Sequence, residues 1–247
     1  MGWYGEPLIG FDLETTGTDP ATARIVTAAV VETKGGEVAA RHGWLADPGV
    51  PIPAGATAVH GITTERAAAA GRPAHEVAEE VAGVLAGHWA LGRPVVAYNA
   101  AFDLTLLSAE LARHGLPSLA DRLRGPDDGA VGDGAAVVGP VIDPLTIDRA
   151  ADRYRKGRRT LAAVCEEYGV VLDDAHEAGA DALAAVRVAR ALAARHGWVG
   201  AMEPWELHRE QIRWYAEWAT GYQSWLRGKG DARAVVDDRW PLREETT

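Results

Sequence analysis

The order of strand and helix patterns along the chain is the feature that most restricts its fold. Apolar and polar residues alternate from Leu8 to Glu14, which indicates a strand, and turn residues 15–17 end it. Two further strand patterns, at 24–33 and 38–45, are joined by a Gly35-Gly36 turn that is typical of a hairpin. Short apolar strands then alternate with helix patterns. This order predicts an α/β protein with a mixed sheet and helices on its faces.

Helices are expected where apolar residues recur at spacings of three and four. Thr63 or Thr64 can cap a first helix, and Pro73 opens a second that ends near residue 87. A short buried strand is predicted at 94–98, and another strand ends at 141–144. Further helices are predicted at about 101–114, 145–154, 160–168 and 179–196.

Composition narrows the class of protein. The 247 residues carry 35 acidic and 25 basic side chains, and 47% are hydrophobic, as in an ordinary globular protein. We expect a cytoplasmic protein without membrane contact, because the sequence shows neither an 18-residue apolar run nor a secretory signal. The single Cys165 excludes an internal disulfide. A net charge of −10 argues against nucleic-acid binding by bulk charge alone, but not against a nuclease whose carboxylates bind cations.

Acidic residues at strand and helix ends are the candidate functional groups. Asp12 and Glu14 lie two apart on a predicted strand, so both project from one face. Carboxylates this close favour a hard divalent cation between them, although two solvated acids would give the same pattern. Asp103 opens a helix, where it could simply face the helix dipole. His176 lies in the predicted loop 173–179, where it could simply be a surface polar residue, and Asp181, five residues later, lies in the first turns of the following helix.

Taken together, these segments resemble a known family. Residues 11–17 (FDLETTG), 97–103 (AYNAAFD) and 176–182 (HEAGADA) look like the three exonuclease motifs of the DnaQ-like DEDDh family. Residues 60–63 (HGIT) are similar to its substrate-lining loop, so the resemblance covers roughly residues 6 to 196. It implies a ribonuclease H-like fold with a five-stranded mixed sheet, and 3′-to-5′ hydrolysis of nucleic acid with two Mg²⁺ or Mn²⁺ ions.

The chemistry of phosphodiester hydrolysis then gives each residue a role. Two cations supply a hydroxide nucleophile and neutralise charge on the leaving 3′ oxygen. We assign Asp12 as the bridging ligand, Glu14 and Asp181 to the ion that activates water, and Asp103 to the second ion. His176 is expected to be the general base and not a metal ligand, because an imidazole of ordinary pKa can take a proton at working pH.

A chain-end nuclease also needs a pocket for the terminal nucleotide. The resemblance implies that Thr15, Thr16 and Gly17 approach the terminal sugar through their backbone. It also implies that His60, Ile62, Asn99 and Phe102 line the pocket, although Phe102 could equally be a core aromatic.

One basic segment stands out in an otherwise acidic chain. Residues 149–159 hold six basic side chains and one acid, and the phosphate-contact candidates among them are Arg155, Lys156, Arg158 and Arg159. A solvated helix face is the simpler reading of such a charge run. Asp143 follows a strand and precedes Pro144, so it is expected to support the site or cap a helix.

Two regions lie outside the family motifs. Residues 125–139 hold five glycines and three aspartates and are expected to form a surface loop. We divide the chain into an exonuclease domain, 1–198, and a tryptophan-rich helical extension, 199–247. Its expected apolar stripe comprises Trp205, His208, Ile212, Tyr215, Ala219, Tyr222 and Leu226, beside a second stripe of Trp214, Trp218 and Trp225.

Three roles are open for this extension. The stripe is too wide for a lone helix, so it could pack on the exonuclease domain or on a second copy of the chain. It could instead bind a replication or repair partner, such as a polymerase. A platform for unpaired bases is the third role, against which the acids Glu203, Glu206, Glu210 and Glu217 weigh.

The leading hypothesis is therefore a metal-dependent 3′-to-5′ exonuclease that acts on single-stranded or frayed DNA ends and releases nucleoside monophosphates. An exoribonuclease is the alternative within the same class. A catalytically weak, polymerase-associated binding module and a hydrolase of small phosphoesters are the alternatives from other classes.

Overall fold

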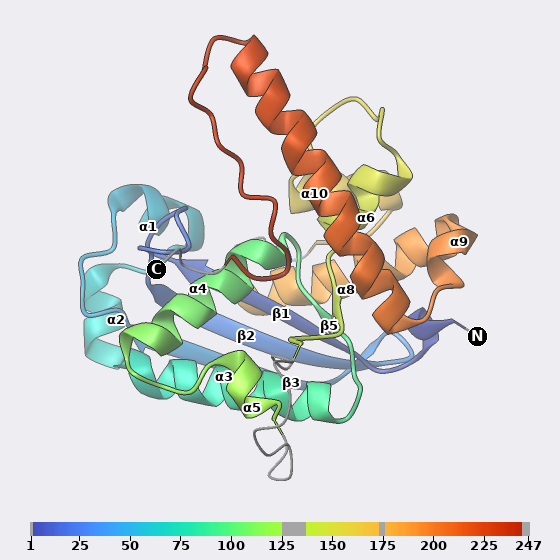
Figure 1. The fold of residues 1–247 in the computed structure, drawn as a ribbon. Helices are drawn as coiled ribbons and strands as arrows, with labels where there is room; N and C mark the ends of the chain where they lie inside the picture. Colours follow the sequence, from blue (N-terminus) through green and yellow to red (C-terminus); the bar gives the residue numbers. More distant parts are fainter. Residues whose placement is uncertain (1, 125–136, 173–175, 244–247) are drawn as a thin grey trace.

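A six-stranded mixed sheet forms the centre of the molecule (Figure 1). The structure is a computed structural model and describes residues 2–124, 137–172 and 176–243. The strand order is β4-β3-β2-β1-β5-β6. The strands span Leu8–Thr15 (β1), Ile25–Lys34 (β2), Glu37–Asp47 (β3), Arg72–Pro73 (β4), Val95–Val96 (β5) and Val141–Ile142 (β6). The predicted α/β class and the predicted hairpin are confirmed.

Strand directions follow from the connections. β1 to β3 pair antiparallel through short turns, whereas β5 and β6 join parallel to β1 after helical crossovers. The predicted count of five strands was one too low. The sixth is the two-residue β4, which pairs parallel with Ala46 and Asp47 at the end of β3. Its residues include Pro73, which the sequence pattern assigned only to a helix start.

Helices cover both faces of the sheet (Figure 1). α3 and α4 pack on the face that holds Phe11 and Leu13, and α8 packs on the opposite face. The helices after the short 3-10 turn Trp3–Gly5 are Ala54–His60 (α1), Thr64–Ala70 (α2), Ala74–Ala90 (α3), Ala100–Arg113 (α4), Leu119–Arg122 (α5), Pro144–Ala151 (α6), Leu161–Tyr168 (α7), Ala178–Arg195 (α8), Gly197–Gly200 (α9) and Pro204–Gly228 (α10).

Helix ends lie within a few residues of the predicted ones. Thr63 caps α2 by accepting a hydrogen bond from the Arg66 N–H, as one of the two predicted caps. α6 is the exception, because it ends at Ala151 and not near residue 154. The chain turns there so that Arg155 and Arg159 reach back to the buried carboxylate of Asp148.

A glycine in β1 lets α8 approach the sheet closely. A Cβ atom on Gly10 would lie 2.5 Å from the backbone oxygen of Ala182, so no other residue fits without moving the helix. Ala182 follows Asp181 directly. The close contact therefore sets the start of α8 beside the end of β1, where Asp12 and Glu14 project on the same side as Gly10.

The extension covers the open edge of the sheet. β6 is an edge strand, and its free backbone groups are paired with side chains of α10. The Gln211 amide donates to the Val141 carbonyl and accepts from the Asp143 N–H, at 3.0 and 2.7 Å. His208 Nδ1 accepts from the Val141 N–H at 3.1 Å. Gln211 thus substitutes for the peptide group of a missing neighbouring strand.

The buried side of α10 differs from the predicted stripe. His208, Tyr215 and Ala219 are buried as expected, but Trp205 and Ile212 are exposed, and the polar Gln211 is fully buried in their place. Gln211 is buried because the free N–H and carbonyl groups at the edge of β6 need a hydrogen-bonding side chain. Hydrophobic periodicity cannot identify such a buried polar position. After α10 the chain returns along the helix, and Trp240 enters the core beside α4 and β1.

The predicted surface loop falls mainly on residues 125–136, which lie outside the described residues. Over the described ranges, no helix has both the length and the apolar character needed to cross a membrane.

Replacing Gln211 with alanine should lower the free energy of unfolding by about 2–4 kcal/mol, because it leaves a buried carbonyl and a buried N–H without partners. Urea denaturation measures this loss. Ile212→Ala, at the exposed neighbouring position, should change stability by less than about 0.5 kcal/mol. Equal effects of the two substitutions would show that Gln211 does not hold the strand edge.

Candidate active site

Three distant segments meet at one end of the central strand β1. Asp12 and Glu14 come from β1, Asp103 from the first turn of α4, and Asp181 from the first turn of α8. Ligand atoms of Glu14, His176 and Asp181 all lie within 4.8 Å of one another. The structure therefore gathers the five residues that the sequence motifs single out, although their catalytic roles stay predictions.

Asp103 is held by the open side of β1. β5 pairs with β1 only at Ile9 and Gly10, so the Leu13 N–H further along has no strand partner. Asp103 Oδ1 accepts a hydrogen bond from this N–H at 3.1 Å. A first-turn acid that merely faced the helix dipole would not need this contact, which fixes the carboxylate next to Asp12.

The gathered carboxylates are electrostatically unfavourable as they stand. Burial raises the pKa of Asp12 well above its ordinary value, and repulsion from Asp103, Asp181 and Glu14 raises it further. Burial is also the main cause that raises the pKa of Asp103. For Glu14, burial and then the charge of Asp181 raise the pKa to about 7.

Within the part of the chain that the structure describes, this charge has no lysine or arginine partner. Among the described residues, no lysine or arginine forms an ion pair with any of the four carboxylates; the arginines of the fold pair with other acids, such as Glu110 and Asp148. Oxygen-only clusters of this kind suit hard divalent cations, which would offset both the repulsion and the cost of burial. The donor set therefore fits the Mg²⁺ or Mn²⁺ ions that the motifs imply.

His176 stands at the rim of the cluster. Its backbone has a φ of 72°, in the left-handed region, and its N–H donates to Asp181 Oδ1 at 3.4 Å. Its side chain is exposed. An imidazole that is open to solvent and adjacent to the carboxylates can take a proton from a water molecule and release it to bulk solvent.

The C-terminal end of α1 brings a second histidine towards the site. His60 Nδ1 accepts from the Ile62 N–H at 3.2 Å, while its buried Nε2 has no hydrogen-bond partner among the described residues. Burial lowers the pKa of His60, the backbone of Thr15 partly offsets this effect, and the charge of His176 lowers the pKa further. A neutral His60 with an unpaired Nε2–H is suited to donate to a substrate oxygen.

Other residues of the predicted nucleotide pocket differ in how accessible they are. Thr15 Oγ1 donates to the Gly17 carbonyl at 2.8 Å, and Thr16 Oγ1 accepts from the Arg24 N–H, so both hydroxyls shape the loop. Ile62 is buried in a small cluster with Val26, and it contributes to packing. Phe102 is half-buried against the main core, so its pocket role stays a prediction.

Asn99 is placed by a buried aspartate. Its φ of 65° is left-handed, which asparagine tolerates better than most residues, and its N–H donates to Asp143 Oδ1 at 2.9 Å. Asp143 also caps α6 by accepting from the Leu145 N–H. The expectation that Asp143 caps a helix is confirmed. The side chain of Asn99 makes no cap hydrogen bond to α4, so it remains available to a ligand.

The basic segment divides into two groups. Arg155 and Arg159 both form ion pairs with the fully buried Asp148, so their first role is to hold the turn after α6. Lys156 and Arg158 are exposed and have no ion-pair partner among the described residues. These two remain the stronger candidates for phosphate contacts.

Sequence reasoning missed the residues that support the site from behind. Asp148 lies in an alternation of acid and base that resembles any solvated helix face, yet it is fully buried. Trp240 donates through Nε1 to Asp143 Oδ2 at 3.4 Å from a segment without a readable pattern. The arginines that follow, Arg155 and Arg159, could have indicated a buried acid such as Asp148, whereas nothing in the sequence indicates Trp240.

The fold is ribonuclease H-like, and a family match shows that the class of protein is an exonuclease. Residues 9–189 match the RNase_T exonuclease family model, which spans well over half of the chain. The chain belongs to the RNase_T exonuclease family, and the resemblance to DnaQ-like exonucleases is confirmed.

Relatives and solved structures agree with this assignment. The chain is 29% identical over 179 residues to the PolC-type DNA polymerase III of Streptococcus thermophilus, and 28% identical over 192 residues to that of Streptococcus pneumoniae. These matches cover 72% and 76% of this chain, but only 10% and 11% of the relatives. The chain thus corresponds to about a tenth of each polymerase.

The fold is also that of exonuclease I. A structure of Escherichia coli exonuclease I in complex with a dA16 oligonucleotide matches with a TM-score of 0.62 and 18% identity, over 85% of this chain and 44% of that one. A second exonuclease I structure matches with a TM-score of 0.60 and 21% identity, over 78% and 42%. At these identities the likeness establishes the fold alone.

Charge repulsion at the site predicts a pH-dependent stability in the absence of metal. Glu14 is ionised less readily in the folded than in the unfolded protein, so its ionisation destabilises the fold above about pH 7, and this cost disappears as pH falls towards the ordinary glutamate range. Glu14→Gln should therefore stabilise the protein by about 1–2 kcal/mol at pH 8, allowing for solvent screening, and by much less at pH 5.

Urea denaturation in EDTA at the two pH values measures this difference. Glu37→Gln, on the exposed start of β3, is the matched control and should leave stability unchanged at both. A stabilisation by Glu14→Gln that is equal at pH 8 and pH 5 would contradict the proposed repulsion.

Proposed function

We propose that this chain is a 3′-to-5′ exonuclease that removes nucleoside monophosphates from the 3′ end of single-stranded DNA with the help of two divalent cations. The observation that carries the proposal is the group of four carboxylates without a basic partner among the described residues, next to His176. Membership of an exonuclease family supports the reaction class. The exonuclease I structures with bound oligonucleotide support single-stranded DNA as the substrate class.

The four carboxylates are the residues that would hold the cations. Asp12 lies centrally, since it is repelled by the other three, and is proposed to contact both ions. Glu14 and Asp181 lie on the side of His176, and Asp103 lies on the side of α4. When bound, such a pair of ions activates a water molecule and neutralises charge on the leaving 3′ oxygen.

His176 is proposed to act as the general base. Its exposed ring lies next to Glu14 and Asp181, so it can accept a proton from the attacking water and then exchange it with solvent. Its left-handed backbone belongs to a turn just before α8, where the ring can move towards bound substrate without disturbing the helix.

The residues around the cluster are proposed to hold the chain end. His60 offers an unpaired, buried Nε2, and Asn99 offers a side chain that no helix cap uses. His60 lies within electrostatic range of His176, and Asn99 precedes the helix that carries Asp103, so both are proposed to contact the last nucleotide. Lys156 and Arg158 are proposed to contact phosphates of the preceding nucleotides.

The PolC-type relatives support a role beside a DNA polymerase. Because the chain spans only about a tenth of those proteins, that role is part of the proposal. An RNA substrate is the competing outcome, and a direct comparison of substrates decides between them.

Asp12→Asn should abolish hydrolysis, with at least a thousandfold lower turnover, because the amide removes the central charge without changing the size of the side chain. The measurement is digestion of 5′-labelled and 3′-labelled DNA and RNA strands with Mg²⁺ or Mn²⁺. A 3′-to-5′ DNA exonuclease shortens the 5′-labelled DNA stepwise and releases the 3′ label at once. Hydrolysis at the wild-type rate by Asp12→Asn would refute the proposed ligand set.

His176→Ala should lower turnover by about 10²–10⁴-fold and leave the affinity for Mn²⁺ within about threefold of wild type, because a general base contributes to rate and not to ion binding. Calorimetric titration with Mn²⁺, alongside steady-state kinetics, separates the two effects. A large loss of Mn²⁺ affinity would instead make His176 a ligand.

A further inference from the structure

Helix α10 carries a ladder of stacked aromatic rings. The rings of Trp218 and Tyr222 lie 5.4 Å apart at an angle of 12°, and those of Tyr222 and Trp225 lie 5.7 Å apart at 14°. Spacings of four and three residues place them on one side of the helix. Over seven residues the ladder extends about 10 Å along the helix axis, since each residue rises about 1.5 Å.

The ladder continues the side of α10 that packs on the core lower down. Tyr215 and Ala219 are buried there, and the helix then runs on past the sheet (Figure 1). Tyr222 is 41% exposed and Trp225 is 55% exposed. Packing within the chain therefore does not account for the upper rings.

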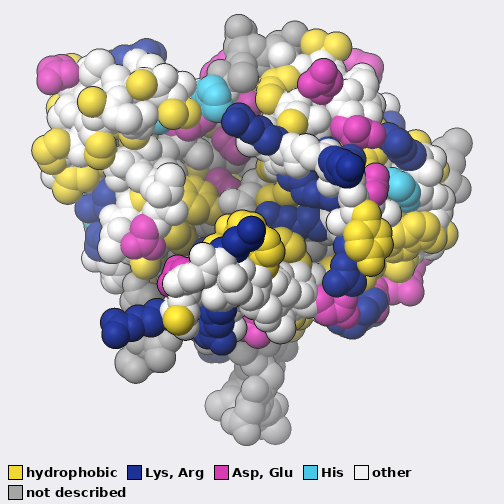
Figure 2. Space-filling model, turned by 90° about the horizontal axis from the view of Figure 1, so that it is seen from above, with side chains coloured by type: hydrophobic (Ala, Val, Ile, Leu, Met, Phe, Trp, Pro, Cys, Tyr) yellow, Lys and Arg dark blue, Asp and Glu magenta, His cyan; other side chains and the backbone are white. Residues whose placement is uncertain are grey.

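Cations lie at both ends of the ladder. The Arg149 guanidinium of α6 lies 3.6 Å from the centre of the Trp218 ring, and Lys229 Nζ lies 5.9 Å from that of Trp225. The segment after α6 adds the exposed Lys156 and Arg158 close to Arg159, which is itself within electrostatic range of Arg149. Lys and Arg side chains are interleaved with hydrophobic ones on the face seen in Figure 2.

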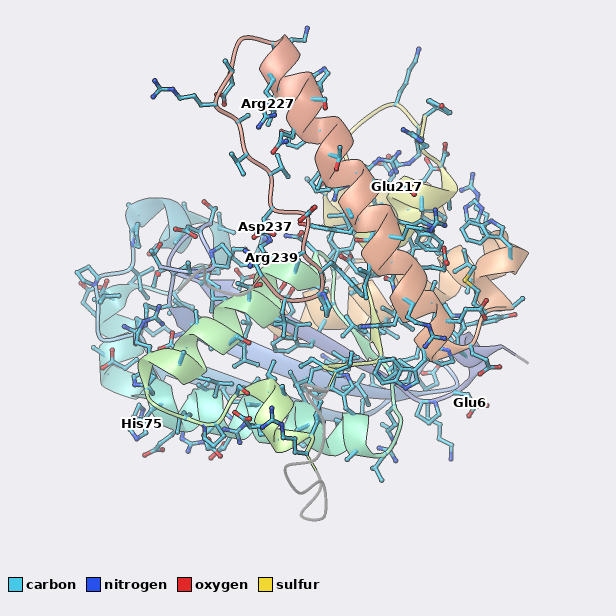
Figure 3. The ribbon with its side chains drawn as sticks, viewed as in Figure 1. Glu6, His75, Glu217, Arg227, Asp237 and Arg239 are labelled. Atoms are coloured by element: carbon cyan, nitrogen blue, oxygen red, sulfur yellow. The ribbon has the colours of Figure 1, made fainter. Side chains whose placement is uncertain are left out.

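The acids of α10 do not oppose this charge. Glu203 and Glu206 form the capping box at the far end of the helix. Glu210 and Glu217 both form ion pairs with Arg213. Arg227 turns to the other side of the helix, where it donates to the Ala234 carbonyl of the returning chain (Figure 3). Arg149 and Lys229 are thus the charged groups that the structure places over the rings of the ladder.

The ladder is also connected to the active site. Asp143, which holds Asn99, starts α6, and Arg149 lies on the same helix less than two turns later. A strand whose 3′ end occupies the acidic site could therefore pass Arg149 and continue over the exposed rings. We propose that Trp218, Tyr222 and Trp225, with Arg149 and Lys229, form an auxiliary site that binds unpaired nucleotides upstream of the cleaved end.

Single-stranded nucleic acid is the occupant that fits this surface. The offset stacking leaves part of the Tyr222 and Trp225 rings exposed, and aromatic rings can stack on bases of any sequence while flanking cations pair with phosphates. A protein partner that buried this side would have to leave the cations at both ends of the ladder unpaired or supply acids to match them. The inference rests on the proposed function, because it requires a polynucleotide substrate.

Binding of 5′-labelled dT3 and dT16 to the full chain in EDTA tests the inference by fluorescence anisotropy. The double variant Tyr222→Ala/Trp225→Ala should bind dT16 about tenfold or more weakly than wild type. It should hydrolyse dT3 in Mg²⁺ within about twofold of the wild-type rate, because dT3 is too short to reach the ladder. Trp198→Ala, an exposed tryptophan away from the ladder, is the matched control and should bind dT16 normally.

Tryptophan emission gives a second readout. Addition of dT16 should quench it in the wild type and in Trp198→Ala, and much less in Trp225→Ala. Unchanged dT16 binding by the double variant would overturn the inference. If sedimentation shows that the wild type is a dimer and that the double variant is a monomer with intact dT16 binding, the ladder is a contact between copies and the inference is likewise overturned. If the wild type cleaves neither oligonucleotide but the double variant loses dT16 binding, the proposed function fails and the auxiliary site stands.

Discussion

The repulsion among four converging carboxylates is the constraint on which the rest of this structure depends. Asp12 and Asp103 are buried beside each other, and Glu14 and Asp181 add charge at the open side. A fold gains nothing from this arrangement by itself, since burial and like charges both disfavour ionisation. The arrangement is favourable only when positive charge enters between the oxygens, and for this reason the geometry favours cation-dependent chemistry over a structural role.

The scaffold holds these groups together through contacts that leave little freedom. Gly10 lets the backbone of α8 touch β1, which sets Asp181 opposite Asp12, and the free Leu13 N–H fixes Asp103. The extension stabilises the same region from the edge, because Gln211 completes the hydrogen bonds of β6. The strand edge leads directly to Asp143 and hence to Asn99. The extension therefore supports the site while its upper end remains free for another role.

Local pattern was sufficient for the parts of the molecule that local interactions determine. The hairpin and the cap at Thr63 follow from turn and capping chemistry, and the positions of Asp12 and Glu14 follow from strand alternation. Long-range contacts were not readable in the same way. The hydrogen bonds of Gln211 to the edge strand join residues that are far apart in the chain. The ion pairs of the buried Asp148 with arginines depend on a turn after α6 that helix periodicity does not encode. Motif resemblance supplied what periodicity could not, namely that three distant acidic segments meet.

A manganese anomalous difference map from crystals soaked in Mn²⁺ tests the central claim most directly, since it locates the ions without relying on activity. The account predicts two peaks enclosed by the carboxylates of Asp12, Glu14, Asp103 and Asp181, with His176 close by but not coordinating. Empty density between these oxygens, or side chains that point away from one another around bound ions elsewhere, would contradict it.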